Sequence, residues 1–85
     1  MEKLKEKYFV VFSSNYHGYY IEALLKRHGI KSSLRKAPSS VAKSCHFAIY
    51  IQEGDFKKAV HLIQQTQIKI QGIYEITDEG YRRIE

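Results

Sequence analysis

Tyr8-Phe9-Val10-Val11-Phe12 is a continuous apolar run, rich in β-branched and aromatic side chains, near the start of the 85-residue chain. A short run without a polar residue predicts a strand buried on both faces, which belongs in the centre of a sheet. Ser13-Ser14-Asn15 follows directly and ends the strand. These side chains offer the oxygen atoms that cap the first turn of a helix.

A helix is expected next, from about Tyr16 to His28. Its apolar residues fall on a single stripe at spacings of one, four and five positions: Tyr20, Ile21, Leu24 and Leu25. Gly29 fits the left-handed position that ends a helix. Gly18, in the first turn, either permits a close backbone approach or has no special role.

The next segments read as two strands joined by a loop. In residues 30–37 one face would carry Ile30, Ser32 and Leu34 and the other only polar side chains. This weak apolar content indicates a half-exposed strand at a sheet edge, and Pro38 ends it. After the loop, Phe47-Ala48-Ile49-Tyr50-Ile51 is a second strongly apolar strand. The chain therefore offers two central strands and one edge strand up to this point.

A second helix and a last strand complete the pattern. The helix has a buried stripe at positions i, i+3, i+4 and i+7: Phe56, Ala59, Val60 and Ile63. Residues 68–76 read as the final strand, in which Gly72 marks a bulge or a close approach. Residues 77–85 are polar and are expected to form a tail, either loose or briefly helical, with Tyr81 and Ile84 as anchors.

The order strand, helix, strand, strand, helix, strand is the ferredoxin-like βαββαβ pattern of an α+β sandwich. It predicts a four-stranded antiparallel sheet with two helices on one face, and right-handed crossovers place strands one and three side by side. We expect a single domain over residues 1–85, with a core at about 7–76 and the polar tail at 77–85. The second sheet face is expected to be open to a partner or to a second copy of the chain.

Composition narrows the classes of function. Fourteen Lys and Arg residues against nine Asp and Glu give a formal net charge of +5. That charge alone does not favour nucleic-acid binding, because dedicated binders cluster their cations more tightly. No apolar run approaches the roughly 20 residues of a membrane span, and no signal-peptide pattern opens the chain, so a cytoplasmic protein is expected.

The same counts argue against a metal centre or a bound cofactor. A single cysteine excludes an internal disulfide and a CxxC pair. The four histidines are scattered without the spacing of metal ligands. No phosphate-binding glycine loop or paired-carboxylate motif is present. We expect no metal and no cofactor.

The loop from Pro38 to Cys45 is the best candidate for chemistry. It holds the only proline and the only cysteine, and the hydroxyls of Ser39, Ser40 and Ser44 could donate hydrogen bonds to a thiolate. Lys43 and His46, its neighbours in sequence, could lower the thiol pKa if their side chains converge on it. The alternative is a cysteine that serves as a small buried apolar residue at the start of a strand.

Topology adds a second group of residues to this loop. Strand three runs antiparallel to strand one, so Cys45, at its start, is expected beside the end of strand one and the N-terminus of the first helix, which favours anions. This places Ser13, Ser14, Asn15, His17 and Cys45 in one neighbourhood. His17 is either a base for the thiol or a solvent-exposed helix residue. No acidic third residue is evident, so a thiol hydrolase is not expected.

Four segments in the expected order carry a resemblance to a known family. They are residues 8–14 (YFVVFSS), 24–30 (LLKRHGI), 37–45 (APSSVAKSC) and 70–74 (IQGIY). Over about residues 7–76 the chain resembles the putative selenium/sulfur carrier protein-like family, a family of small bacterial domains. The most specific part is the proline, the serine-bearing stretch and the single cysteine at the head of strand three.

The resemblance implies that Cys45 carries sulfur or selenium as a persulfide-type adduct. It further implies donor and acceptor proteins as partners, and a carrier with no enzymatic turnover. Two positions differ from the family pattern, which has glycine where His46 stands and arginine where Ser39 stands. The alternative function is a non-catalytic interaction or small-ligand-sensing module of ferredoxin-like fold, which could pair as a homodimer.

Overall fold

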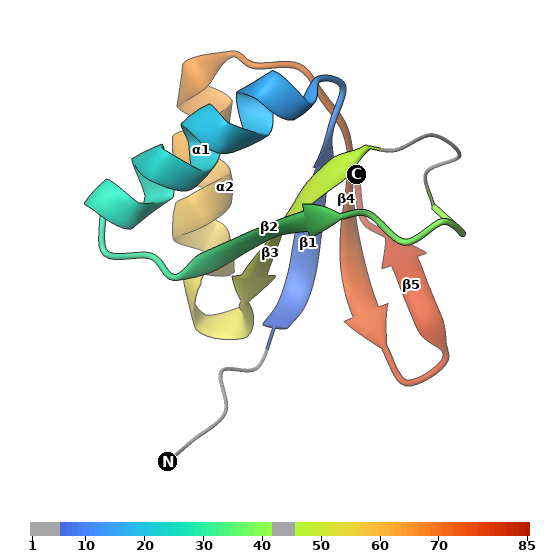
Figure 1. Ribbon diagram of the computed structural model, residues 1–85. Coiled ribbons are helices and arrows are strands. Elements are labelled where there is room, and N and C mark those ends of the chain that lie inside the picture. The colour runs from blue at the N-terminus through green and yellow to red at the C-terminus, as the bar shows by residue number, and fades with distance from the viewer. Residues whose placement is uncertain (1–5, 42–45) are drawn as a thin grey trace.

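The computed structural model describes residues 6–41 and 46–85, which form an antiparallel sheet with two helices (Figure 1). The elements in chain order are β1 (Glu6–Phe12), α1 (Asn15–Arg27), β2 (Ser32–Lys36), β3 (Phe47–Gln52), a 3₁₀ turn η1 (Glu53–Asp55), α2 (Phe56–Thr66), β4 (Ile70–Thr77) and β5 (Gly80–Arg83). The strands lie in the order β2-β3-β1-β4-β5. The apolar run at residues 8–12 is therefore the central strand, as its composition predicts.

The sheet has five strands, so the prediction of four is wrong. The first four strands are those expected, and β1 and β3 are neighbours. The fifth strand forms inside the segment expected to be a tail, where Gly80 turns the chain with φ +133° and residues 80–83 pair with β4. A four-residue strand with mostly polar side chains has too little periodicity to be recognised in the sequence.

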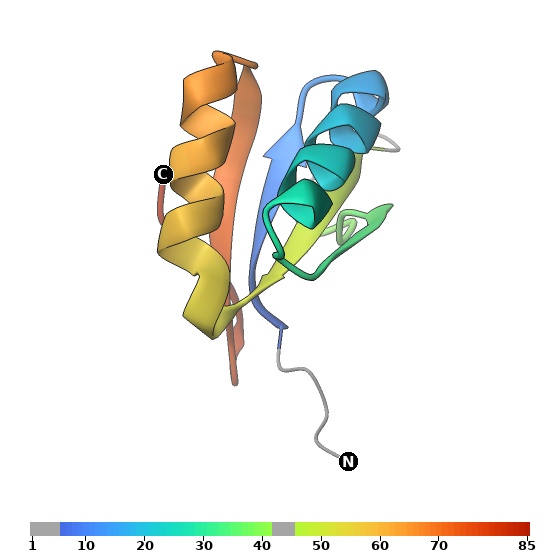
Figure 2. The same cartoon turned by 90° about the vertical axis from the view of Figure 1, so that its left-hand side faces the viewer.

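Both helices cover the same face of the sheet (Figure 2). On this face Val10 and Phe12 of β1 and Ile49 and Ile51 of β3 are buried. They pack against the buried helix residues Ile21, Leu25, Ala59 and Ile63. Truncating one of these leucine or isoleucine side chains to alanine costs about 2–5 kcal/mol. No helix within residues 6–41 and 46–85 is long and apolar enough to cross a bilayer.

The second face of the sheet is also buried, which corrects the expectation of an open face. Phe9 is fully buried, and its ring centroid lies 5.1 Å from Tyr50 and 5.2 Å from Tyr74. Tyr81 of β5 stands edge-on to Phe9, with 5.4 Å between ring centroids. Val41, in the β2–β3 connection, packs on the same cluster. The fifth strand and that connection thus take the place of a partner.

Helix α1 begins and ends within one residue of the predicted bounds. The Ser14 side chain accepts a hydrogen bond from the Tyr16 backbone, and Gly29 has φ +77° just after the last turn. A Cβ at Gly18 would lie 2.9 Å from Leu34 Cδ1, so this glycine permits close packing of α1 on β2. Tyr20 departs from the expected apolar stripe and is 50% exposed.

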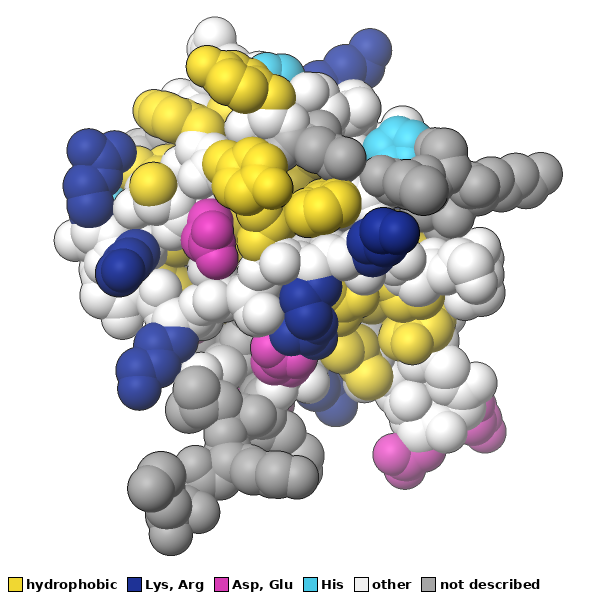
Figure 3. Space-filling view, viewed as in Figure 1, with side chains coloured by type: hydrophobic (Ala, Val, Ile, Leu, Met, Phe, Trp, Pro, Cys, Tyr) yellow, Lys and Arg dark blue, Asp and Glu magenta, His cyan; other side chains and the backbone are white. Residues whose placement is uncertain are grey.

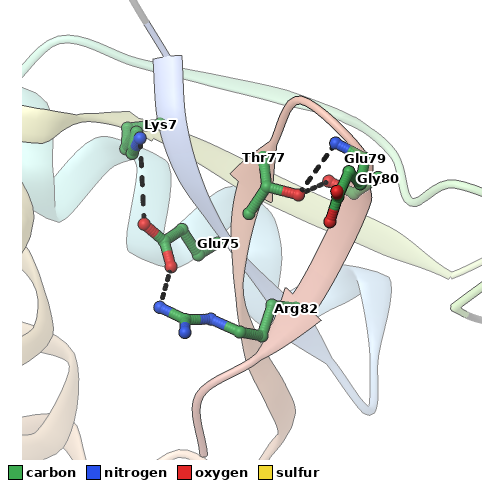
Figure 4. Close-up of polar contacts among 6 residues, drawn as sticks. All are labelled: Lys7, Glu75, Thr77, Glu79, Gly80 and Arg82. Carbon is green, nitrogen blue, oxygen red and sulfur yellow. Dashed lines mark hydrogen bonds and ion pairs between the residues drawn. The ribbon is translucent and has the colours of Figure 1, made fainter.

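Glu75 and Thr77 secure the β4–β5 hairpin (Figure 4). The Glu75 carboxylate pairs with Arg82 on β5 and, at 3.8 Å, with Lys7 on β1. Thr77 Oγ1 donates to the carbonyl of Gly80 at 3.1 Å and accepts from the Glu79 backbone at 3.2 Å. The side chains of β4 therefore define both the turn and the register of the strand that covers the second face.

Candidate functional site at the head of strand β3

The register of the sheet brings the start of β3 to the end of β1. Val11 pairs with Ala48 on one side and with Gly72 of β4 on the other. His46, two residues before Ala48, therefore lies at the end of the sheet where β1 leads into α1. The start of β3 thus lies beside the end of β1, which is the arrangement of these two strands that the sequence predicts. Lys43, Ser44 and Cys45 lie outside the described residues, so their predicted positions stay predictions.

The residues between β1 and α1 form an ordinary helix start. Ser14 Oγ accepts from the Tyr16 backbone at 3.3 Å, and the Ser14 carbonyl accepts from the backbone of His17 at 3.1 Å. Ser13 is exposed, and Asn15 is the first residue of the helix. The first turn contains no acidic residue, so the partial positive charge of the helix end is not neutralised there.

His17 is half-buried on α1. Its Nδ1 atom is fully buried and has no hydrogen-bond partner within residues 6–41 and 46–85. Its one ring contact in that part of the chain is with Tyr16, at 6.1 Å between centroids. Because Cys45 lies outside the described residues, the role of His17 as a base toward the thiol stays a prediction.

The loop that begins at Pro38 is anchored to the sheet. The Ala37 backbone donates to the His46 carbonyl at 2.8 Å, which extends the β2–β3 ladder by one pair. The Pro38 carbonyl accepts from the Val41 backbone at 3.0 Å and closes a turn. Because Val41 also packs on the second face of the sheet, the two ends of this loop are fixed while Ser39 and Ser40 remain exposed.

Two residues that are not among the predicted site residues lie near His46: Gln71 contacts its ring, and Arg83 in turn contacts Gln71. Its Nε2 lies 3.4 Å from Gln71 Nε2 on β4. Arg83 Nη2 of β5 donates to the Gln71 carbonyl at 2.9 Å. Gln71 is the extra residue of a bulge, since Val11 pairs with Gly72 and the next β1 residue pairs two positions earlier on β4.

Gly72 makes room for this arginine. A Cβ at Gly72 would lie 3.3 Å from Arg83 Nε and 3.1 Å from the Tyr74 ring. The predicted alternatives for Gly72, a bulge or a close approach, are both present at this position. The signal in the sequence was Gly72 itself. Arg83 could not be inferred, because its place depends on a strand that the sequence does not reveal.

The described groups at this end of the sheet favour an anion. They are the N-terminus of α1, the His46 ring, the Gln71 amide and the Arg83 guanidinium. Within the two described ranges, no group of three or more His, Cys, Asp or Glu side chains is arranged to hold a metal ion. The chemistry that this end offers is therefore stabilisation of negative charge at the start of a strand.

The fold and this site define a small α+β protein with an anion-favouring sheet end and no described metal-binding group. The chain belongs to the putative Se/S carrier protein-like family, whose family model matches residues 7–75. The match includes every predicted site residue and ends before β5. No curated protein and no solved structure matches the chain.

Proposed function

We propose that this chain is a sulfur or selenium carrier and that Cys45 accepts the chalcogen. The observation that carries the proposal is the family match over residues 7–75, within which Cys45 is the only thiol. A thiol is the group that can hold sulfur or selenium as a persulfide or selenosulfide. The anion-favouring groups around His46 support the assignment, because the adduct and the free thiolate are both anionic.

The transfer needs no redox co-reactant. The Cys45 thiolate attacks the outer sulfur of a donor persulfide, the S–S bond of the donor breaks, and the donor leaves as a thiolate. Release follows the same chemistry: an acceptor thiolate attacks the outer sulfur on Cys45, the S–S bond breaks, and Cys45 leaves as a thiolate. Selenium in the outer position follows the same path.

In this account the protein has no catalytic turnover of its own. Donor and acceptor proteins supply and remove the chalcogen, and a reducing, cytoplasmic setting keeps the single thiol available between transfers. Lys43 and the α1 N-terminus stabilise the anion, and Arg83 adds a further cation at this end of the sheet. We also assign the first four strands and both helices to the ferredoxin-like pattern, with β5 as an addition.

Loading of the protein with glutathione persulfide tests the proposal. Intact mass spectrometry should show the addition of one sulfur atom to the wild type and none to Cys45→Ser. The matched control is Ser32→Ala, at the opposite end of β2 from the Ala37–His46 pair, which keeps the thiol and should load. A wild type that stays unmodified, or an equal adduct on Cys45→Ser, would exclude Cys45 as the acceptor.

A further inference from the structure

Strand β2 presents a backbone edge that no described strand covers. It is the last strand in the order β2-β3-β1-β4-β5 within residues 6–41 and 46–85. The Ala37 backbone donates toward β3, to the His46 carbonyl. Because antiparallel strands alternate the direction of their backbone groups, Ser32 and Leu34 point their N–H and C=O groups away from β3. An added strand could bond to these groups.

A groove lies beside this edge. It has a volume of about 820 Å³ and runs between the outer side of α1 and the segment that leads into β2. Tyr19, Ala23 and Lys26 line it from α1, and Ile30, Lys31 and Ser32 line it from the strand side. Side chains of a strand added to β2 would therefore alternate into this groove.

The helix wall of the groove carries one exposed tyrosine, Tyr19, and two further tyrosines are exposed nearby on α1. Tyr19 is 60% exposed, and its neighbours Tyr16 and Tyr20 are 79% and 50% exposed. Figure 3 shows hydrophobic side chains gathered between α1 and β2, with Lys and Arg on both sides of them. Tyrosines contribute large, rigid contact areas to protein interfaces and are frequent among their strongest contacts.

The positive charge of the groove favours an acidic binding partner. Lys26 and Lys31 line the groove, Lys36 stands further along β2, and none of the three forms an ion pair with a described residue. Glu22 is the single acidic residue of the lining. Two β2 edges from two copies would bring these lysines together, and like charges across paired strands are destabilising. A second copy of the chain is therefore a poor occupant.

The geometry points to a docking site for an extended, acidic segment of a partner protein, which adds to the sheet beside β2. Its backbone bonds to Ser32 and Leu34, its apolar side chains pack against Tyr19 and Ala23, and its carboxylates pair with Lys26 and Lys31. This is strand addition with charge-based selection. The inference does not depend on the chemistry of Cys45.

Nuclear magnetic resonance titration tests the site with a short synthetic peptide that alternates glutamate and valine. The amide signals of Ser32 and Leu34 should shift and saturate, and binding should weaken as salt is raised. A peptide with lysine in place of glutamate should not bind. Cys45→Ser should bind as the wild type does, which separates this result from the test of the carrier function.

Three variants, one of them a control, locate the interaction. Lys26→Glu combined with Lys31→Glu should weaken binding by at least about tenfold. Lys57→Glu combined with Lys69→Glu makes the same change in net charge away from the groove and should have a much smaller effect. Ser32→Pro removes one outward N–H at the first residue of an edge strand, where proline is tolerated, and should weaken binding while the fold is kept.

Three results would overturn the inference. One is the absence of a saturable shift at β2 up to about 1 mM peptide, which would place the dissociation constant above about 1 mM. Another is equal weakening by the two double variants, which would reduce the effect to net charge. The third is dimerisation of the free protein through β2, seen as a concentration-dependent sedimentation coefficient, which would make a second copy the occupant.

Discussion

Tyr50 links three strands on the second face of the sheet. Its hydroxyl donates to the Lys36 carbonyl at 3.1 Å, and the Arg35 guanidinium lies 4.0 Å from its ring centroid. Arg35 is held there by Glu6, which accepts hydrogen bonds of 2.8 and 3.1 Å. Burial raises the pKa of Tyr50 above 10.0, although the charge of Arg35 opposes the shift.

This pKa shift makes stability fall at high pH. The folded protein keeps the Tyr50 proton at pH values where the unfolded chain loses it, so ionisation favours unfolding once pH exceeds about 10. The contribution is complete below that pH and is lost as pH rises through the folded pKa. Urea unfolding at neutral pH and at about pH 11 should show a smaller alkaline loss for Tyr50→Phe than for wild type.

The same substitution should lower stability at neutral pH by about 1 kcal/mol, because the hydrogen bond to the Lys36 carbonyl is lost. Tyr20→Phe, at an exposed helix position, is the control and should leave the alkaline loss unchanged. An identical alkaline loss in Tyr50→Phe and wild type would show that Tyr50 is not its source.

Gly18 and Leu34 should be energetically coupled. In the wild type, Gly18→Ala gains about 1 kcal/mol in helix propensity but forces a Cβ to within 2.9 Å of Leu34 Cδ1. In a Leu34→Ala background that conflict is absent, so the same substitution should stabilise. Chemical unfolding of the double-mutant cycle measures the difference, and equal effects in both backgrounds would contradict the contact.

At the scale of single residues, part of the site could be predicted from the sequence. Ser14 is a helix cap and Gly72 lies at a bulge, both in line with their residue types. Gln71 and Arg83 could not be predicted, because the contact of Gln71 with His46 and of Arg83 with Gln71 depends on the pairing of β4 with β1 and β5. Side-chain neighbours that come from three strands depend on register, and the polar residues of β5 carry no hydrophobic pattern that would indicate its register.

At the scale of elements, the strong hydrophobic periods were sufficient to predict both helices and the first four strands. Both helices and the first four strands form where their patterns place them, because each has an apolar face that must be buried. β5 was missed because its polar side chains give no such period. Tyr20 was misassigned for the opposite reason: it continues the apolar stripe in the sequence, yet its side chain is 50% exposed.

The start of α1 offers a test at this scale. Ser14→Ala removes the side-chain acceptor of the Tyr16 backbone N–H and should lower the free energy of unfolding by about 1 kcal/mol. Ser13→Ala is the matched control, since that hydroxyl is exposed and makes no hydrogen bond within the described residues. Urea denaturation compares the two, and similar losses would argue against the cap.

For the whole molecule, the distribution of burial differs from what a two-layer pattern suggests. Helices cover one face of the sheet, and the other is closed by Tyr81 from β5 and by Val41 from the β2–β3 connection. The surfaces left for partners are therefore at the ends and edges of the sheet. The head of β3 and the edge of β2 are two such places, joined by the contact of Tyr19 with Phe47 at 6.3 Å between ring centroids.

The central claim is that the folded chain makes Cys45 an acceptor of sulfur. The most direct measurement is the rate of sulfur transfer from glutathione persulfide to the native protein, compared with a synthetic peptide of residues 36–48 that contains the same cysteine. The account predicts that the native protein reacts at least about tenfold faster, because the folded surroundings stabilise the thiolate. A peptide that reacts as fast as the protein, or faster, would contradict it.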